Sequence, residues 1–132
     1  EVGRLFDECQ SLPPDRERIA RLLRSLVFDP GLIGDDLIEE IYRWRLDEPH
    51  HAEAWSRSTI VARSNLAALA AVVAPTLVIH GRHDRMVPLE GALQLLSHLP
   101  SADLVVLNKC GHWPPFERPW DFARAVRAFL SS

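Results

Sequence analysis

The chain has 132 residues, of which 47% are hydrophobic and 25% are charged, and these values predict one globular domain or part of one. Its 15 Lys and Arg residues against 18 Asp and Glu residues give a formal net charge of -3, so charge does not favour nucleic acid or a membrane surface as a partner. The longest apolar stretch, from Leu66 to Ile79, contains Pro75 and is shorter than the roughly 20 residues that span a bilayer. The first residues do not resemble a signal peptide, and Cys9 and Cys110 are too few for a disulfide framework. We therefore expect a soluble protein of the cytoplasm.

Residues 1–72 carry patterns that are typical of helices. Asp15 can cap a helix whose apolar residues recur at the i, i+3, i+4, i+7 and i+8 spacing of one helix face. These residues are Ile19, Leu22, Leu23, Leu26 and Val27. A second helix is expected to start at Asp35 or Asp36 and to end before Pro49. Two more helices are expected, over residues 52–62 and 66–72. The front of the chain is predicted to be a small helical layer.

From Pro75 onward the pattern alternates between strands and helices. Residues 76–80 form a short, nearly continuous apolar run closed by Gly81, which is typical of a strand buried on both faces. The pattern then predicts a helix over residues 88–98, a strand over residues 104–107 and a final helix from Pro119. This order implies right-handed crossovers and a parallel sheet, and so an α/β fold. Because two parallel strands cannot complete such a sheet, we expect the chain to be the C-terminal piece of a larger α/β domain.

The loops after the two predicted strands contain an aspartate and a histidine. Asp84 lies in the loop 81–88, and His112 lies in the loop 109–116. Neighbouring parallel strands are about 4.8 Å apart and both loops leave the same edge of the sheet, so the two side chains can come within hydrogen-bonding distance. A carboxylate that orients a histidine is the base half of a catalytic triad. The acid precedes the histidine by 28 residues, and this order is that of α/β-hydrolases.

Each of these polar residues also has a purely structural interpretation. Asp84 can be a turn-forming aspartate that bonds its own backbone, and His112 can be a surface or core histidine. Cys110 stands beside the histidine, but buried cysteines are commonly inert, so we favour packing over catalysis for this thiol. His80 and His83 form a His-x-x-His pair, which is a weak metal pattern, and we expect no metal.

Two sequence runs carry a family resemblance. They are Pro-Thr-Leu-Val-Ile-His-Gly-Arg-His-Asp-Arg-Met-Val-Pro at residues 75–88 and Asn-Lys-Cys-Gly-His-Trp-Pro-Pro-Phe-Glu-Arg-Pro at residues 108–119. Together they resemble the C-terminal third of α/β-hydrolases. Among these they are most similar to the meta-cleavage product hydrolases, which split a carbon-carbon bond in ring-opened aromatic compounds. Residues 29–33 and 35–42 also resemble the cap helices of that family.

This resemblance implies a division of the chain and roles for its residues. Residues 1–72 would be a helical cap, or lid, and residues 73–132 would be the C-terminal part of the hydrolase core domain. Asp84 would be the acid and His112 the general base of a Ser-His-Asp triad, and Trp113 would be either a wall of the substrate pocket or a packing residue. The implied activity is the cofactor-independent hydrolysis of a small-molecule substrate. The resemblance also allows a homo-oligomer.

The sequence departs from the family pattern in two places. It contains no Gly-x-Ser-x-Gly, so we expect the nucleophile on an N-terminal segment of the same hydrolase, and we expect no activity from this chain alone. Ile41 stands where family members usually carry an arginine that holds the polar substrate, and Arg43 or Arg45 can replace it if the helix register differs.

Three functions therefore stay open, two of them enzymatic. The residues expected to contact the substrate are Trp113, Ile41 and Arg45. The apolar Ile41 makes an ester or lactone hydrolase the enzymatic alternative to cleavage of a carbon-carbon bond. A non-catalytic binding protein is the third interpretation, and it requires that the partner segment lack the serine.

Overall fold

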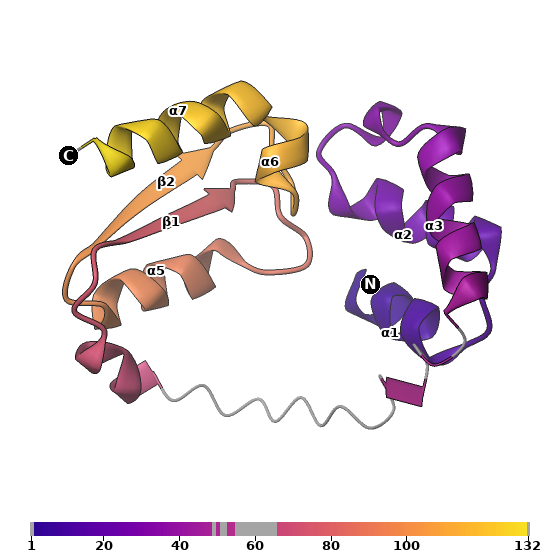
Figure 1. Cartoon of the computed structure of the whole chain (residues 1–132), viewed down its shortest axis with the longest axis horizontal. Coiled ribbons are helices and arrows are strands. Elements are labelled where there is room, and N and C mark those ends of the chain that lie inside the picture. The colour runs from indigo at the N-terminus through magenta and orange to yellow at the C-terminus, as the bar shows by residue number, and fades with distance from the viewer. Residues whose placement is uncertain (1, 49, 51–52, 55–65, 132) are drawn as a thin grey trace. The chain divides into compact units, whose positions relative to one another are not determined.

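The computed structural model describes residues 2–48, 50, 53–54 and 66–131, which belong to two compact units (Figure 1). The first unit spans residues 1–62 and the second spans residues 63–132. The described part of the first unit is helical, and the second unit contains strands as well as helices. Within the described residues, no helix combines the length and the apolar composition that crossing a membrane requires.

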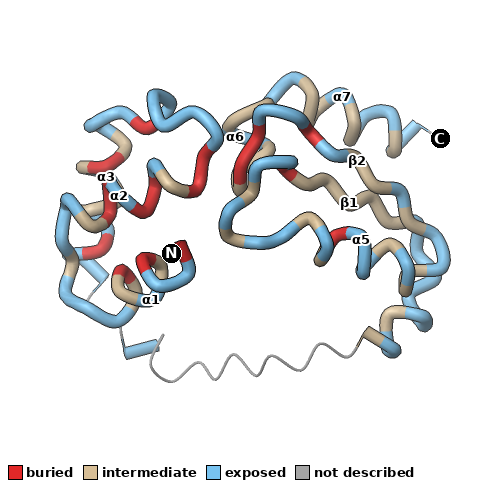
Figure 2. Tube along the Cα trace, turned by 180° about the vertical axis from the view of Figure 1, so that it is seen from behind, coloured by how far each residue is buried: buried red, intermediate tan, exposed pale blue. Residues whose placement is uncertain are grey.

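The first unit is built around helix α2. Its elements are α1 (Val2–Ser11), α2 (Arg16–Leu26), the 3-10 helix η1 (Pro30–Leu32) and α3 (Asp35–Asp47). α2 packs against both α1 and α3, so its apolar face lies at the centre of the unit. The predicted stripe is buried in full: Ile19, Leu22, Leu23, Leu26 and Val27. Most of the buried positions that Figure 2 marks belong to this unit.

The ends of these helices follow from local chemistry. The Asp15 carboxylate accepts a hydrogen bond of 2.7 Å from the backbone N–H of Arg18, which caps the first turn of α2 as predicted. α3 begins at the predicted Asp35 and ends at Asp47. α1 has no counterpart among the predicted elements. The helix predicted over residues 52–62 lies almost wholly outside the described residues.

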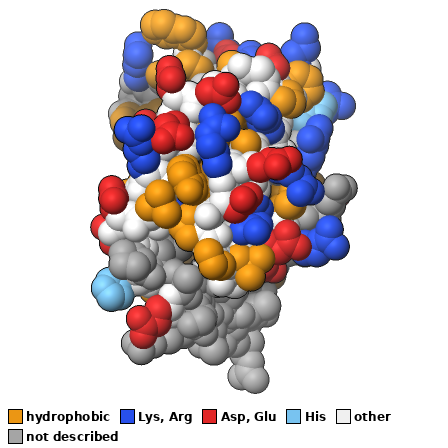
Figure 3. Space-filling view, turned by 90° about the vertical axis from the view of Figure 1, so that its right-hand side faces the viewer, with side chains coloured by type: hydrophobic (Ala, Val, Ile, Leu, Met, Phe, Trp, Pro, Cys, Tyr) orange, Lys and Arg blue, Asp and Glu red, His pale blue; other side chains and the backbone are white. Residues whose placement is uncertain are grey.

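Charged side chains of α2 and α3 pair on the outside of the first unit. Arg16 lies 3.3 Å from Asp35 and 3.5 Å from Glu39, and Arg43 lies 2.8 Å from Glu39. These side chains are largely exposed, so each pair contributes roughly 0–1 kcal/mol to stability. Basic and acidic side chains are interspersed on the face drawn in Figure 3, so neither sign dominates that face.

The second unit contains a parallel strand pair. β1 (Thr76–Gly81) runs beside β2 (Ala102–Leu107), with Thr76 opposite Ala102 and Gly81 opposite Leu107. The other elements are η2 (Leu66–Ala71), α5 (Leu89–His98), α6 (Pro114–Glu117) and α7 (Pro119–Leu130). α5 and α7 lie on either side of the strand pair (Figure 1). The predicted order and the predicted parallel pairing are both confirmed, and α6 is an additional helical turn.

The short helix η2 belongs to the second unit. It packs against α5, although the sequence pattern groups residues 66–72 with the helical front of the chain. The division of the chain by contacts therefore falls before η2. Whether residues 1–72 act together as a lid stays a prediction.

The two strands are only half-buried by the described residues. Residues 76–80 of β1 are all partly exposed, and Gly81 and Leu107 at the carboxyl ends are the buried positions of the pair. The sequence predicts strands buried on both faces, which is the environment of a parallel sheet. The described sheet has two strands, so much of that apolar surface is left uncovered. Apolar strands with half-exposed faces are the pattern expected of strands that belong to a wider sheet.

β1 ends where its backbone touches the loop after β2. A Cβ atom added at Gly81 would lie 1.9 Å from the carbonyl oxygen of Gly111 and 2.7 Å from that of Cys110, so only glycine fits here without movement of the backbone. Close by, the backbone N–H of His83 donates to the Cys110 carbonyl at 2.8 Å. The loops after the two strands are thus joined through their main chains.

Gly81→Ala is expected to destabilise the protein by more than the roughly 1–3 kcal/mol of an ordinary overpacked core, because the clash is with backbone rather than with a side chain. Thermal or urea unfolding measures this change. Gly3→Ala in α1 is the matched control, because a Cβ there meets nothing within 4 Å. The control is expected to gain roughly 0.5–1 kcal/mol from the helix preference of alanine. A Gly81→Ala variant as stable as the wild type would contradict the contact.

Candidate active site

Asp84 organises the loop that follows β1. Its backbone N–H donates to the Gly81 carbonyl at 3.2 Å, which closes a tight turn. Its Oδ1 atom accepts hydrogen bonds from the backbone N–H groups of Met86 at 2.7 Å and Val87 at 3.0 Å. The Asp84 side chain is 6% exposed. Asp84 is therefore a turn-forming aspartate with a second carboxylate oxygen, Oδ2, that the turn does not use.

That second oxygen meets His112. The Nδ1 atom of His112 lies 2.9 Å from Asp84 Oδ2. With Nδ1 donating to the carboxylate, Nε2 of the neutral imidazole is left to accept a proton. The His112 side chain is 32% exposed, so the base is reachable while its acid partner is shielded. Both side chains line a hollow of about 200 Å³, together with Ile79, Val87 and Pro114.

This geometry can accept and return a proton. A shielded carboxylate holds the imidazole in one tautomer and stabilises the imidazolium that forms when Nε2 takes a proton. A base of this kind needs a nucleophile within about 2.6–3.2 Å of Nε2. The described residues that line the hollow include no serine and no cysteine. The hollow therefore holds a hydrogen-bonded Asp–His pair, and its described lining residues add no serine or cysteine nucleophile.

His80 is a third titratable residue at the hollow. Its Nδ1 atom lies 2.9 Å from the Gly81 carbonyl, which can only accept, so Nδ1 carries the hydrogen. Its Nε2 atom lies 3.9 Å from Asp84 Oδ2, and the side chain is 11% exposed. The sequence suggested His80 only as a weak metal ligand. Among the described residues there is no group of three or more His, Cys, Asp and Glu side chains that could hold a metal ion.

Trp113 packs against its own helical turn. It is the N-cap residue of α6, and its ring lies edge-on to that of Phe116, with 6.0 Å between the ring centroids. Its half-buried side chain adjoins His112 in sequence but is not among the residues that line the hollow. The predicted role of Trp113 as a pocket wall stays a prediction.

Ile41 and Arg45 both lie on α3 in the first unit, and their surroundings differ. Ile41 is half-buried. Arg45 is buried, and its guanidinium donates to the Gln10 side chain at 2.8 Å and to the Cys9 carbonyl at 2.5 Å. Burial lowers the pKa of Arg45 below its ordinary value. Arg45 therefore links α3 to α1, and its predicted contact with the substrate stays a prediction. Arg43, by contrast, is exposed.

Cys110 has the environment of an inert thiol. It is fully buried in the loop after β2, where its thiol points to the Gly111 carbonyl at 3.8 Å. Burial raises the pKa of this thiol to about 11, and the nearby Glu117 carboxylate adds to the rise. The thiolate is the nucleophilic form of cysteine, so Cys110 is protonated and unreactive near neutral pH.

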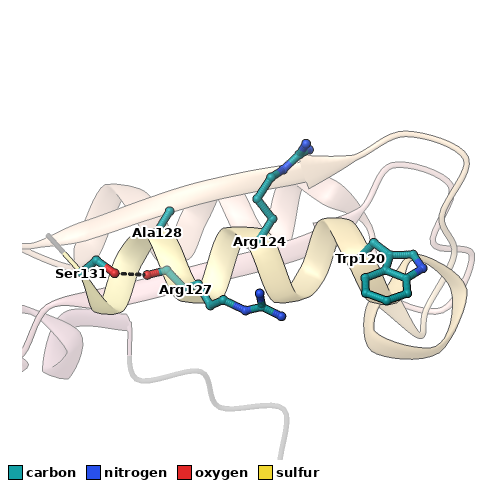
Figure 4. A pocket seen from close by; sticks show the side chains of 5 residues that line it. All are labelled: Trp120, Arg124, Arg127, Ala128 and Ser131. Atoms are coloured by element: carbon teal, nitrogen blue, oxygen red, sulfur yellow. Dashed lines mark hydrogen bonds between the residues drawn. The ribbon is translucent and has the colours of Figure 1, made fainter.

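A second hollow lies along α7 (Figure 4), and it has no acid–base pair among its lining residues. Its volume is about 340 Å³, and it is lined by Trp120, Arg124, Arg127, Ala128 and Ser131. The hydroxyl of Ser131 donates to the Arg127 carbonyl at 2.7 Å, and Arg124 pairs with Asp121 at 2.8 Å. The hydrogen-bonded pair of Asp84 and His112 lies instead at the carboxyl ends of β1 and β2.

Asp84 follows the end of β1, His112 follows the end of β2, and the two are hydrogen-bonded. An aspartate and a histidine in these places are typical of α/β-hydrolases. The sequence matches the family model described as "alpha/beta hydrolase fold" over residues 21–119, and the chain belongs to this family of enzymes. Its elements correspond to the C-terminal part of such a hydrolase.

The curated relatives have named hydrolase activities, whereas the family model describes only the fold. The chain is 32% identical over 123 residues to a 2-hydroxy-6-oxononadienedioate/2-hydroxy-6-oxononatrienedioate hydrolase of Cupriavidus pinatubonensis. It is 35% identical over 126 residues to a 2-hydroxymuconate semialdehyde hydrolase of Pseudomonas putida. These matches cover 90% and 89% of this chain but only 43% and 44% of the relatives. The chain thus spans less than half the length of the curated relatives it matches.

Solved structures agree with this relationship. A mutant of the meta-cleavage product hydrolase CumD of Pseudomonas fluorescens IP01 is 28% identical, with a TM-score of 0.82 over 96% of this chain and 49% of that one. The 2-hydroxy-6-oxo-6-phenylhexa-2,4-dienoate hydrolase of Rhodococcus sp. strain RHA1 is 30% identical, with a TM-score of 0.74 over 90% of this chain and 45% of that one. The resemblance to meta-cleavage product hydrolases is therefore confirmed.

The raised pKa of Cys110 predicts a pH dependence of stability. The folded protein holds the thiol proton more tightly than the unfolded chain, whose thiol has a pKa of 9.0. The resulting stabilisation is complete below pH 9 and is lost as the pH rises through about 11. Urea unfolding of the wild type and of Cys110→Ala at about pH 8 and about pH 10.5 measures it. The wild type is expected to lose more stability than the variant, and an equal loss in both would contradict the prediction.

Proposed function

We propose that this chain supplies the acid and the general base of a cofactor-independent serine hydrolase. The observation that carries the proposal is the 2.9 Å contact from His112 Nδ1 to the shielded Asp84 Oδ2. In this mechanism Nε2 of His112 takes the proton of a serine hydroxyl as the hydroxyl attacks a carbonyl carbon. The imidazolium, stabilised by Asp84, then gives that proton to the leaving group.

The nucleophilic serine is proposed to lie on a segment N-terminal to this chain in the same hydrolase. Three observations support this part of the proposal. The sequence contains no Gly-x-Ser-x-Gly motif, and the chain spans about 43% of the relatives' length. The strands β1 and β2 are apolar and half-exposed, as strands of an incomplete sheet would be. The same segment would supply the backbone N–H groups that stabilise the oxyanion.

The proposed substrate is a ring-opened aromatic compound whose carbon-carbon bond is hydrolysed. Support comes from the named activities of the relatives and from the likeness of residues 75–88 and 108–119 to their family. Hydrolysis of an ester or lactone is the alternative, and Ile41 favours it because an apolar residue cannot pair with a substrate carboxylate. A non-catalytic binding protein would carry Gly or Ala in place of the serine, so the sequence of the N-terminal segment separates it from both enzymes.

The helical first unit is proposed to act as the lid of this enzyme. The support is the resemblance of residues 29–33 and 35–42 to family cap helices. A lid rich in Leu, Ile and Trp favours an apolar or aromatic portion of the substrate, because it excludes water from the reacting bond. Ile41 on α3 is the residue proposed to face that portion.

His112→Ala in the complete hydrolase is expected to lower kcat by about 10³-fold or more, because the members of a triad act as a unit. Steady-state kinetics with a meta-cleavage product and with an ester measure the loss. His98→Ala is the matched control, since His98 ends α5 and bonds the Gln94 carbonyl. The control is expected to keep wild-type kcat. Near-normal turnover by His112→Ala on either substrate would refute the assignment of the base.

Ile41→Arg is expected to raise kcat/KM for a dienoate substrate relative to a neutral ester by roughly tenfold, because an arginine can pair with a carboxylate through two hydrogen bonds. Leu46→Arg adds the same charge at an exposed position of the same helix and is expected to leave the ratio unchanged. A wild type that already prefers the dienoate, and that gains nothing from the arginine, would show that Ile41 does not set the preference.

A further inference from the structure

Glu117, the last residue of α6, folds its side chain back onto the loop that carries His112. Its carboxylate accepts hydrogen bonds from the backbone N–H of Gly111, 2.9 Å from each oxygen, and from the backbone N–H of Trp113 at 3.1 Å. These two amides stand immediately before and immediately after His112 in the chain. One side chain therefore restrains the backbone on both sides of the base.

The sequence around α6 favours a tight turn directly after His112. Pro114 and Pro115 have no N–H, so the first two positions of the helix add no donors that need capping. The N–H groups of Phe116 and Glu117 both donate to the Trp113 carbonyl at 2.9 Å. Trp113 is thus bonded to Glu117 through its carbonyl and through its N–H, which fixes the turn between His112 and α6.

The neighbouring residue, Arg118, fastens the beginning of the same loop. Its Nη1 atom donates to the carbonyl of Asn108 at 2.6 Å, just after the end of β2. Its Nη2 atom pairs with Asp121 at the start of α7. The carboxylate of Glu117 and the guanidinium of Arg118 therefore hold the loop 108–113 at its two ends, the first through amides and the second through a carbonyl.

We propose that Glu117 is a positioning residue for the general base. Asp84 orients the ring of His112, while Glu117 fixes the peptide groups from which that ring projects. Without the carboxylate, two amides next to His112 lose their partner, and Nδ1 is no longer held at 2.9 Å from Asp84 Oδ2. Glu117 touches no reacting atom, so its effect on turnover passes through His112. This inference rests on the proposed function of His112 as the base.

The test compares Glu117→Ala and Glu117→Gln with the wild type in the complete hydrolase. Glu117→Ala is expected to lower kcat by about 10²-fold, the effect of a misplacement of about 1 Å, with KM little changed. Glu117→Gln keeps one oxygen that can accept from an amide, so its expected loss is smaller, about tenfold. Glu90→Ala, at an exposed glutamate in the first turn of α5, is the matched control and is expected to keep wild-type kcat.

A proton NMR measurement separates positioning from a loss of stability. The Nδ1 proton of His112, shared with Asp84, is expected to give a low-field resonance in the wild type and in Glu90→Ala. The same resonance is expected to be weakened or absent in Glu117→Ala at a temperature where circular dichroism shows that variant to be folded. If Glu117→Ala does not fold, Glu117→Gln takes its place in both measurements.

The outcomes distinguish this inference from the proposed function. If His112→Ala is inactive while a folded Glu117 variant keeps wild-type kcat and the low-field resonance, Glu117 does not position the base, and the triad assignment stands. If His112→Ala is itself active, the proposed function fails and this inference fails with it. A lower melting temperature with unchanged kcat would assign Glu117 a role in stability alone and would overturn the proposal.

Discussion

The backbone contact between Gly81 and Gly111 is the constraint on which the candidate site depends. Adjacent parallel strands are about 4.8 Å apart, but the loops that leave them are free to diverge unless something joins them. Here the absence of a side chain at Gly81 lets the main chain of β1 touch the main chain of the loop after β2. That contact sets the spacing between the two loops, and the pairing of Asp84 with His112 follows from it.

Features encoded by short sequence patterns were predictable, because each depends on residues close together in the chain. The stripe from Ile19 to Val27 and the cap at Asp15 define α2. The apolar run of residues 76–80 closed by Gly81 defines β1. The positions of Asp84 and His112 at the carboxyl ends of two strands predicted their contact, since parallel strands bring those ends together. The sequence therefore located the contact between Asp84 and His112, and the roles of acid and base stay a proposal.

The features that were not predicted are α1, the contacts that α1 makes, and the turn α6. α1 does have an apolar face, since Val2, Leu5, Phe6 and Cys9 follow the i, i+3, i+4 and i+7 spacing, but its sequence shows no cap signal, and it packs on α2. Because α1 was not predicted, the hydrogen bonds of Arg45 to Gln10 and Cys9 were not predicted either. The turn α6 was hidden because Pro114 and Pro115 suggest a break, although proline is well suited to the first positions of a helix.

The two oxygens of Asp84 have separate partners, and this division ties the shape of the loop to its chemistry. Oδ1 is engaged by the amides of Met86 and Val87, and Oδ2 by the imidazole of His112. An asparagine could present its oxygen to only one of these sets, and its NH₂ group would then face a donor on the other side. An asparagine could therefore keep either the turn or a hydrogen bond from Nδ1–H of His112, but not both. Asp84 is thus constrained both by the turn and by its hydrogen bond with His112, whereas its neighbours Arg82 and Arg85 are exposed.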